Sequence, residues 1–146
     1  MKSPNRFIYT IIFLIVCQLS FSQTVFGKWK TVDDRNGTEK AIIEVYEKDG
    51  LLYGEVIKIL EKGKKEAKCE KCKGERKNKP VLGMEVITAA SKTDKNEYKG
   101  KKLFDPEQAM TFRCKIWLNP DNTDELKVRG YLAFVYRTQT WIRVKE

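Results

Sequence analysis

The chain has 146 residues, with 29 Lys or Arg against 20 Asp or Glu, so its formal net charge is +9. It contains no histidine, which excludes the Ser-His-Asp and Cys-His catalytic arrangements. The length is typical of one domain, and we expect neither an enzyme nor a bound cofactor.

The first segment has the pattern of a signal peptide. Lys2 and Arg6 precede an apolar run over residues 7–19. That run is shorter than the roughly 20 residues that a membrane-spanning helix needs. Ser20-Phe21-Ser22 then provides small residues at the expected cleavage site. We therefore predict that residues 1–22 are cleaved and that the protein is exported to the periplasm or the extracellular space.

Two alternatives stay open for this leader. It could remain as an uncleaved anchor, or the protein could be a lipoprotein lipidated at Cys17, although Val16 stands where a small residue is preferred. After cleavage the mature domain covers residues 23–146, carries a net charge of +7 and has no transmembrane segment.

Three strands are predicted in the first part of the mature chain. Apolar and β-branched residues are frequent in 25–32, 41–47 and 51–60, the predicted strands. Asp33-Asp34-Arg35-Asn36-Gly37 and Lys48-Asp49-Gly50 separate them, and Asn-Gly and Asp-Gly are typical of tight turns.

Residues 61–79 interrupt this pattern and form what we call the basic loop. The segment has nine basic and four acidic residues and no aromatic residue. A solvated loop is the simplest interpretation. It could also dock on an anionic envelope surface, but nucleic acid is not expected, because single-strand binders interleave aromatic platforms with basic residues.

Strand patterns return after the basic loop. We predict strands over 82–90, 97–104 and 111–118, one helical turn at 105–107, and a closing hairpin over 124–144 whose second strand begins at Thr138. In that hairpin Leu126, Val128 and Leu132 lie on one face, whereas Lys127, Arg129 and Tyr131 lie on the other.

About eight short strands with short connections favour an all-β fold, a single up-and-down antiparallel barrel. The last strand needs a partner, and the strand around Gly27-Lys28-Trp29 is the candidate that closes the sheet. A barrel of this size is either filled by side chains or holds one small ligand.

Gly27-Lys28-Trp29 is similar to the Gly-x-Trp motif of lipocalins and their calycin relatives. The resemblance implies that a basic residue on the last strand covers this tryptophan. Arg143 is the candidate, and Arg137 is the second choice. A guanidinium stacked on an indole is worth about 0.5–2 kcal/mol.

The wider pattern resembles domain of unknown function 2147, a family of small exported bacterial proteins. The matching segments are Gly27-Lys28-Trp29-Lys30-Thr31, Leu52-Tyr53-Gly54, Cys69-Glu70-Lys71-Cys72-Lys73-Gly74, Lys79-Pro80-Val81-Leu82-Gly83, Phe104-Asp105-Pro106-Glu107, Lys127-Val128-Arg129-Gly130-Tyr131 and Arg137-Thr138-Gln139-Thr140-Trp141-Ile142-Arg143. The chain has Ala109 and Ala133 where the family pattern leads us to expect glycine. The resemblance implies a lipocalin-like barrel and an exported protein, but no established reaction.

Cys69 and Cys72 form a C-x-x-C pair. In an exported protein we expect a local disulfide. A redox-active pair, which would give a thiol–disulfide enzyme, and a metal site are alternatives. In a further alternative, Cys114 pairs with one of the two. Otherwise Cys114, on the apolar face of its strand, is a buried thiol.

The first functional hypothesis is that the barrel binds a small apolar or amphipathic ligand. The candidate pocket residues are Trp29, Tyr53, Arg129, Tyr131, Trp141 and Arg143. The alternative hypothesis is a non-catalytic protein that docks on an anionic surface through the basic loop.

Overall fold

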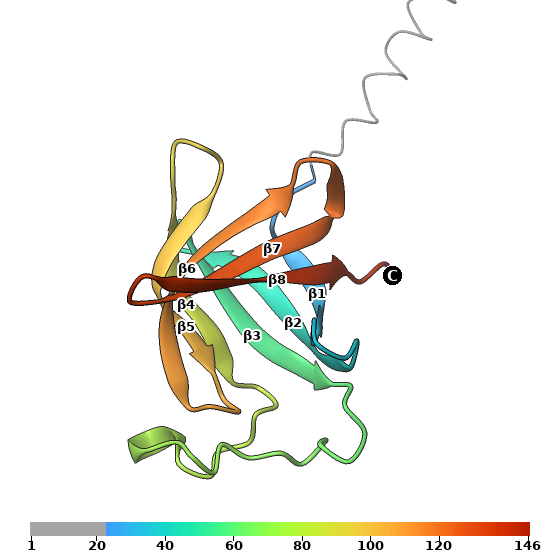
Figure 1. The fold of residues 1–146 in the computed structure, drawn as a ribbon, viewed down its shortest axis with the longest axis vertical. Coiled ribbons are helices and arrows are strands. Elements are labelled where there is room, and N and C mark those ends of the chain that lie inside the picture. Colours follow the sequence, from blue (N-terminus) through green and yellow to red (C-terminus); the bar gives the residue numbers. More distant parts are fainter. Residues whose placement is uncertain (1–22) are drawn as a thin grey trace, which may run out of the picture.

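The computed structural model describes residues 23–146 and shows an eight-stranded closed barrel (Figure 1). The predicted signal peptide lies outside the described residues. The strands are β1 (Gly27–Val32), β2 (Glu39–Lys48), β3 (Leu51–Ile59), β4 (Glu85–Lys92), β5 (Tyr98–Asp105), β6 (Met110–Asn119), β7 (Asn122–Leu132) and β8 (Val135–Arg143).

Each strand pairs antiparallel with the next, and β8 returns to pair with β1. The closing register sets Trp29 opposite Arg143 and Lys30 opposite Ile142. This topology confirms the predicted all-β up-and-down barrel. Closure of the sheet also leaves no free sheet edge.

Two local predictions were wrong. No helix follows Asp105: its Oδ1 accepts hydrogen bonds from the backbone N–H groups of Glu107 and Gln108, but the chain turns directly into β6. The only helix in the described part of the chain is the 3₁₀ turn η2 (Gly74–Arg76) in the basic loop. The last strand begins at Val135 and not at Thr138, so the β7–β8 hairpin is longer than expected.

The barrel interior is filled with apolar side chains from every strand. Trp29, Leu52, Ile87, Ile116 and Leu126 are completely buried. Packing is tight around Gly54, where an added Cβ atom would lie 2.9 Å from Ile87 Cδ1 and a neighbouring side chain would have to shift. Such contacts are typical of a close-packed protein interior.

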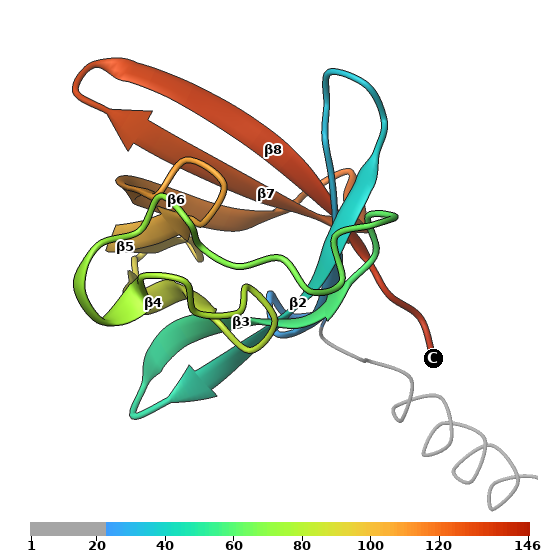
Figure 2. The same cartoon turned by 90° about the horizontal axis from the view of Figure 1, so that it is seen from below.

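The topology gives the barrel two different ends. Because neighbouring strands are antiparallel, the β1–β2, β3–β4, β5–β6 and β7–β8 connections share one end, which we call the loop end. The other end, the termini end, carries the first and last described residues. Figure 2 views the molecule from below, with the basic loop crossing in front and the β7–β8 hairpin extending outward.

Candidate functional site

The termini end is closed by Arg143 and Trp29. The Arg143 guanidinium carbon lies 4.2 Å from the centre of the Trp29 ring, and the Trp29 indole N–H donates to the Val25 carbonyl at 2.8 Å. Arg143 also donates to the backbone carbonyls of Phe26, Thr24 and Thr123. The predicted pairing of Arg143 with Trp29 is present and ties both ends of the chain together.

Arg143 is partly buried next to Asp124. The pKa of Arg143 is lowered by desolvation, and Asp124 partly offsets that effect. The Asp124 Oδ1 and Arg143 Nε atoms are buried, have no hydrogen-bond partner and lie 3.5 Å apart. The contact is a partly buried ion pair, with the Arg143 side chain 18% and the Asp124 side chain 30% exposed.

At the loop end, the basic loop is fastened to the barrel by a small second core. Cys69 and Cys72 form a disulfide, as expected, and pack with Met84 and Phe104. Arg76 from η2 lies 4.2 Å above the Phe104 ring.

The alternative pairing of Cys114 is wrong, because Cys114 is a free and buried thiol.

Ion pairs add further connections at the loop end. Lys40 on β2 contacts Glu61 at 3.0 Å and Glu107 at 3.1 Å, joining the basic loop to the β5–β6 turn. Burial alone would lower the pKa of Lys40, but the hydrogen bonds that Lys40 donates to the two carboxylates, together with their negative charges, outweigh it and raise the pKa.

The β1–β2 connection is joined to β8 in the same way. Arg137 contacts Asp34, and the hydrogen bond from Arg137 lowers the pKa of that carboxyl. The neighbouring Asp33 is buried and accepts three hydrogen bonds from Arg35, which hold its pKa far below the usual range. The loop end thus carries separate groups of charged contacts, one around Lys40 and one between Arg137 and Asp34, which join neighbouring connections of the barrel.

The outer face of β6, β7 and β8 carries a stack of aromatic and cationic side chains. Arg129 lies 4.4 Å from the Tyr136 ring and 5.1 Å from the Trp117 ring. Lys115 lies 4.9 Å from the centre of the Trp117 ring, and the ring centres of Tyr131 and Tyr136 are 6.0 Å apart. These side chains point away from the core, because they alternate with buried Val128 and its neighbours.

The six predicted pocket residues therefore do not line one cavity. Trp29 and Trp141 are buried in the core, and Arg143 closes the termini end. Arg129 and Tyr131 lie on the outer face, as does Tyr53, which stacks on Tyr46 at 5.8 Å. The alternation in the sequence separates the two faces of a strand but does not show which aromatic residues meet.

An apolar surface that the sequence analysis did not single out lies on the inner face of the β7–β8 hairpin. Leu132 and Val135 face each other across the hairpin and share their faces with buried Leu126 and Trp141. They nevertheless remain 52% and 64% exposed. The surface continues inward past Gly130, where a Cβ atom would contact Leu103 and Phe112 at 3.5–3.6 Å. We call Leu103, Phe112, Leu132 and Val135 the mouth surface.

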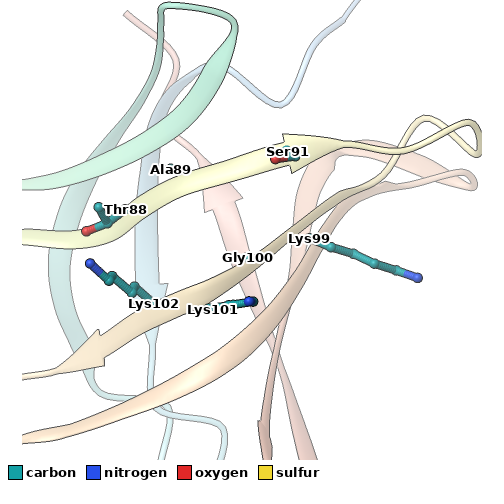
Figure 3. A pocket seen from close by; sticks show the side chains of 7 residues that line it. All are labelled: Thr88, Ala89, Ser91, Lys99, Gly100, Lys101 and Lys102. Atoms are coloured by element: carbon teal, nitrogen blue, oxygen red, sulfur yellow. The ribbon is translucent and has the colours of Figure 1, made fainter.

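The best-formed depressions on the molecule lie elsewhere, on the side of the barrel. One is lined by Thr88, Ala89, Ser91, Lys99, Gly100, Lys101 and Lys102, and Figure 3 shows Lys102 extending toward Thr88 while Lys99 points away. The other lies over Gly100 and Cys114. Both are partly open to solvent, and lysine side chains contribute to both linings. In the described residues no three His, Cys, Asp or Glu side chains are grouped as a metal site.

Comparison with known proteins agrees with the barrel fold. The family model described as "Uncharacterized protein conserved in bacteria (DUF2147)" matches residues 27–143. The chain belongs to this family. The match runs from the Gly-x-Trp strand to Arg143, so the DUF2147 region spans the whole barrel, including both strands that close it.

A solved structure with the same fold is described as "Protein HP1028 from the human pathogen Helicobacter pylori belongs to the lipocalin family". Its sequence is 19% identical to this DUF2147 chain, 86% of each chain is covered, and the TM-score is 0.72. At this identity the likeness shows a lipocalin-like fold alone. No curated protein matches the chain.

Among the described residues, none belongs to a helix that is long and apolar enough to cross a membrane.

Proposed function

We propose that this protein is an exported, non-enzymatic binder of a small apolar or amphipathic ligand, which it holds at the loop end against the mouth surface. The observation that carries the proposal is the exposure of Leu132 and Val135 on the inner face of the barrel wall. Inner faces of small barrels are normally covered, by side chains or by a ligand. Large exposed apolar side chains next to a barrel opening are typical of binding sites.

The charges around the mouth surface suit an amphipathic ligand with an acidic group. Arg137 lies on the same face of β8 as Val135, and its partner Asp34 comes from a connecting loop. A carboxylate or phosphate on the ligand could take the place of Asp34 while its apolar part covers Leu132 and Val135. The packed interior limits the ligand to the opening of the barrel.

The test compares two positions on one strand. Val135→Ser changes the inner face, whereas Tyr136→Ser changes a similarly exposed residue on the outer face of β8. Native mass spectra of protein purified from its own source should show an added mass that is lost under denaturing conditions. We expect Val135→Ser to weaken binding of a fluorescent fatty-acid probe by about tenfold and Tyr136→Ser to leave it within about twofold. Equal effects of both variants, or no probe binding by the wild type, contradict the proposal.

A second candidate function is docking on an anionic envelope surface through the basic loop. It is supported by the way the disulfide and the Phe104 contact hold this loop in place while most of its lysines stay exposed. Replacing Lys62, Lys64 and Lys65 by glutamate should abolish binding to anionic vesicles at low salt. Unchanged binding contradicts this function.

A further inference from the structure

The tip of the β7–β8 hairpin, residues 132–136, is the most apolar exposed feature of the described chain. Phe134 is 95% exposed, and Tyr136 is 59% exposed. With Leu132 and Val135, four of the five tip residues are large, apolar or aromatic, and exposed. No other described segment gathers exposed apolar side chains in this way, since the remaining ones, Leu82 and Ile142, are isolated. An apolar protrusion of this kind marks an interaction site.

The side chains behind the tip follow an order that matches the depth profile of a membrane surface. Phe134 stands at the turn, and Tyr131 and Tyr136 pack together directly behind it. Behind them, Arg129 stacks on Tyr136, whereas Arg113 reaches the turn itself and donates to the Ala133 carbonyl at 3.1 Å. Aromatic residues with a polar group prefer the headgroup region, and cations pair with lipid phosphates.

We propose that the hairpin tip inserts into the surface of an anionic lipid bilayer, with Phe134 entering the acyl-chain boundary and the arginines binding headgroup phosphates. The basic loop lies at the same end of the barrel, because the β3–β4 and β7–β8 connections share the loop end. Its lysines therefore approach the same surface and add long-range attraction.

Charge favours a bilayer over a second copy of this chain as the occupant. After cleavage of the predicted signal peptide the chain carries a net charge of +7. Arg113 and Arg129 contact the tip residues Ala133 and Tyr136, and Arg137 follows Tyr136 in β8. Two tips brought together would bring these arginines together, which is unfavourable, whereas an anionic bilayer neutralises them. The inference deepens the second candidate function, since both need an anionic surface, but it assigns the insertion to a different element.

The experiment measures partitioning onto vesicles of phosphatidylcholine alone and of phosphatidylcholine mixed with phosphatidylglycerol. We expect the wild type to bind the mixed vesicles more tightly, and Phe134→Ser to weaken that binding by at least about tenfold. Ile142→Ser is the matched control, because Ile142 is an exposed apolar residue at the other end of the same strand. It should bind as the wild type does.

Insertion itself is read with Phe134→Trp and brominated lipids. The native tryptophans, Trp29, Trp117 and Trp141, supply the baseline. On vesicle binding, the emission maximum of the added tryptophan should shift to shorter wavelength, and the brominated acyl chains should quench its fluorescence. Wild-type binding by Phe134→Ser, or no quenching of Phe134→Trp, overturns the proposal.

The variants also separate this inference from docking by the basic loop. If the glutamate triple variant of Lys62, Lys64 and Lys65 loses binding while Phe134→Ser keeps it, the loop docks and the tip does not insert. If Phe134→Ser loses binding while the triple variant keeps it at low salt, the tip proposal stands and loop docking fails. A Phe134-dependent dimer in solution that binds no vesicles identifies the tip as a self-association surface, and the bilayer proposal is then wrong.

Discussion

The guanidinium of Arg143 covers the indole of Trp29 at 4.2 Å, and the same two residues are paired in the register that closes the barrel. Trp29 is completely buried. The last strand thus seals the first by a side-chain stack and by backbone pairing at the same point. This contact joins residues that are far apart in the chain, at the point where the first and last strands close the barrel.

Replacing Arg143 should therefore lower the stability of the whole barrel. Arg143→Ala removes the stack and the hydrogen bonds to Phe26, Thr24 and Thr123. We expect a loss of about 3 kcal/mol in the free energy of unfolding. Arg143→Lys should lose less, because it keeps the charge but not the planar fork.

Urea unfolding followed by circular dichroism measures these changes. Arg129→Ala is the control, since Arg129 stacks on Trp117 and Tyr136 on the outer face. An exposed stack is worth only about 0.5–1 kcal/mol. Equal losses for Arg143→Ala and Arg129→Ala would show that the barrel closure does not depend on the Arg143 contact.

Glycine at positions 109 and 133 should stabilise the protein. Ala109 and Ala133 both adopt φ of +53°, a left-handed conformation that costs a non-glycine residue about 1–2 kcal/mol. Ala133 is the first residue of a two-residue hairpin turn, where glycine is preferred. We expect each alanine-to-glycine change to raise the free energy of unfolding by about 0.5–1 kcal/mol.

The control for these substitutions is Ala67→Gly in the basic loop, because Ala67 does not have a positive φ. It should lower stability slightly, because glycine adds freedom to the unfolded chain. Thermal unfolding of all three variants provides the comparison. A loss of stability in Ala109→Gly and Ala133→Gly would mean that alanine is not strained at these turns.

The strands could be predicted from the sequence because the alternation of apolar and polar residues is regular. On β7, Leu126 and Val128 are buried, and Lys127 and Arg129 face outward, as expected. The contact between Trp29 and Arg143 was predicted from the resemblance to the Gly-x-Trp motif of lipocalins, which implies a basic residue over this tryptophan. At positions 109 and 133, where the family pattern leads us to expect glycine, the alanines adopt a positive φ of 53°.

The candidate site was harder to predict. Tyr53, Arg129 and Tyr131 were grouped with Trp29, Trp141 and Arg143 as one candidate pocket for an apolar or amphipathic ligand, but they stack with other partners on the outer face. Leu132 and Val135 look like core residues in the alternation pattern. Only the three-dimensional structure shows that the hairpin extends beyond the barrel and leaves them uncovered.

Breaking the Cys69–Cys72 disulfide should affect the basic loop far more than the barrel. The two cysteines are three positions apart, and so short a loop gains only about 2 kcal/mol in the chain-entropy model. The pair packs on Phe104 and Met84, away from the main core. We expect the Cys69→Ser/Cys72→Ser variant to unfold within about 2 kcal/mol of the wild type, but to be cut rapidly by trypsin between residues 61 and 84.

The same disulfide is poorly suited to thiol exchange. Cys69 is completely buried and Cys72 nearly so, whereas a redox-active cysteine must be accessible to its partner. Insulin reduction assays with the wild type and the double variant should give equal, background rates. A rate that depends on Cys69 would instead support a thiol–disulfide enzyme.

Cys114 should make the protein less stable at alkaline pH. Burial raises the pKa of its thiol to about 11, although a hydrogen bond from the Gly100 backbone opposes this shift. The unfolded thiol loses its proton near pH 9 and the folded thiol only near pH 11, so ionisation between these values favours the unfolded state. The contribution of the protonated Cys114 thiol to the free energy of unfolding is fully present below pH 9 and is lost as the pH rises through 11.

The expected loss from Cys114 is about 2–3 kcal/mol by pH 11, at about 1.4 kcal/mol for each pKa unit. Between pH 7 and pH 11, the Tm of thermal unfolding should decrease more steeply for the wild type than for Cys114→Ala. Part of the decline should remain in the variant, because burial also raises the pKa of Tyr98. The comparison uses the slope with pH and not the absolute stability, so the small cavity left by the substitution does not affect it. Parallel slopes for the two proteins would show that the Cys114 thiol ionises as easily in the barrel as in the unfolded chain.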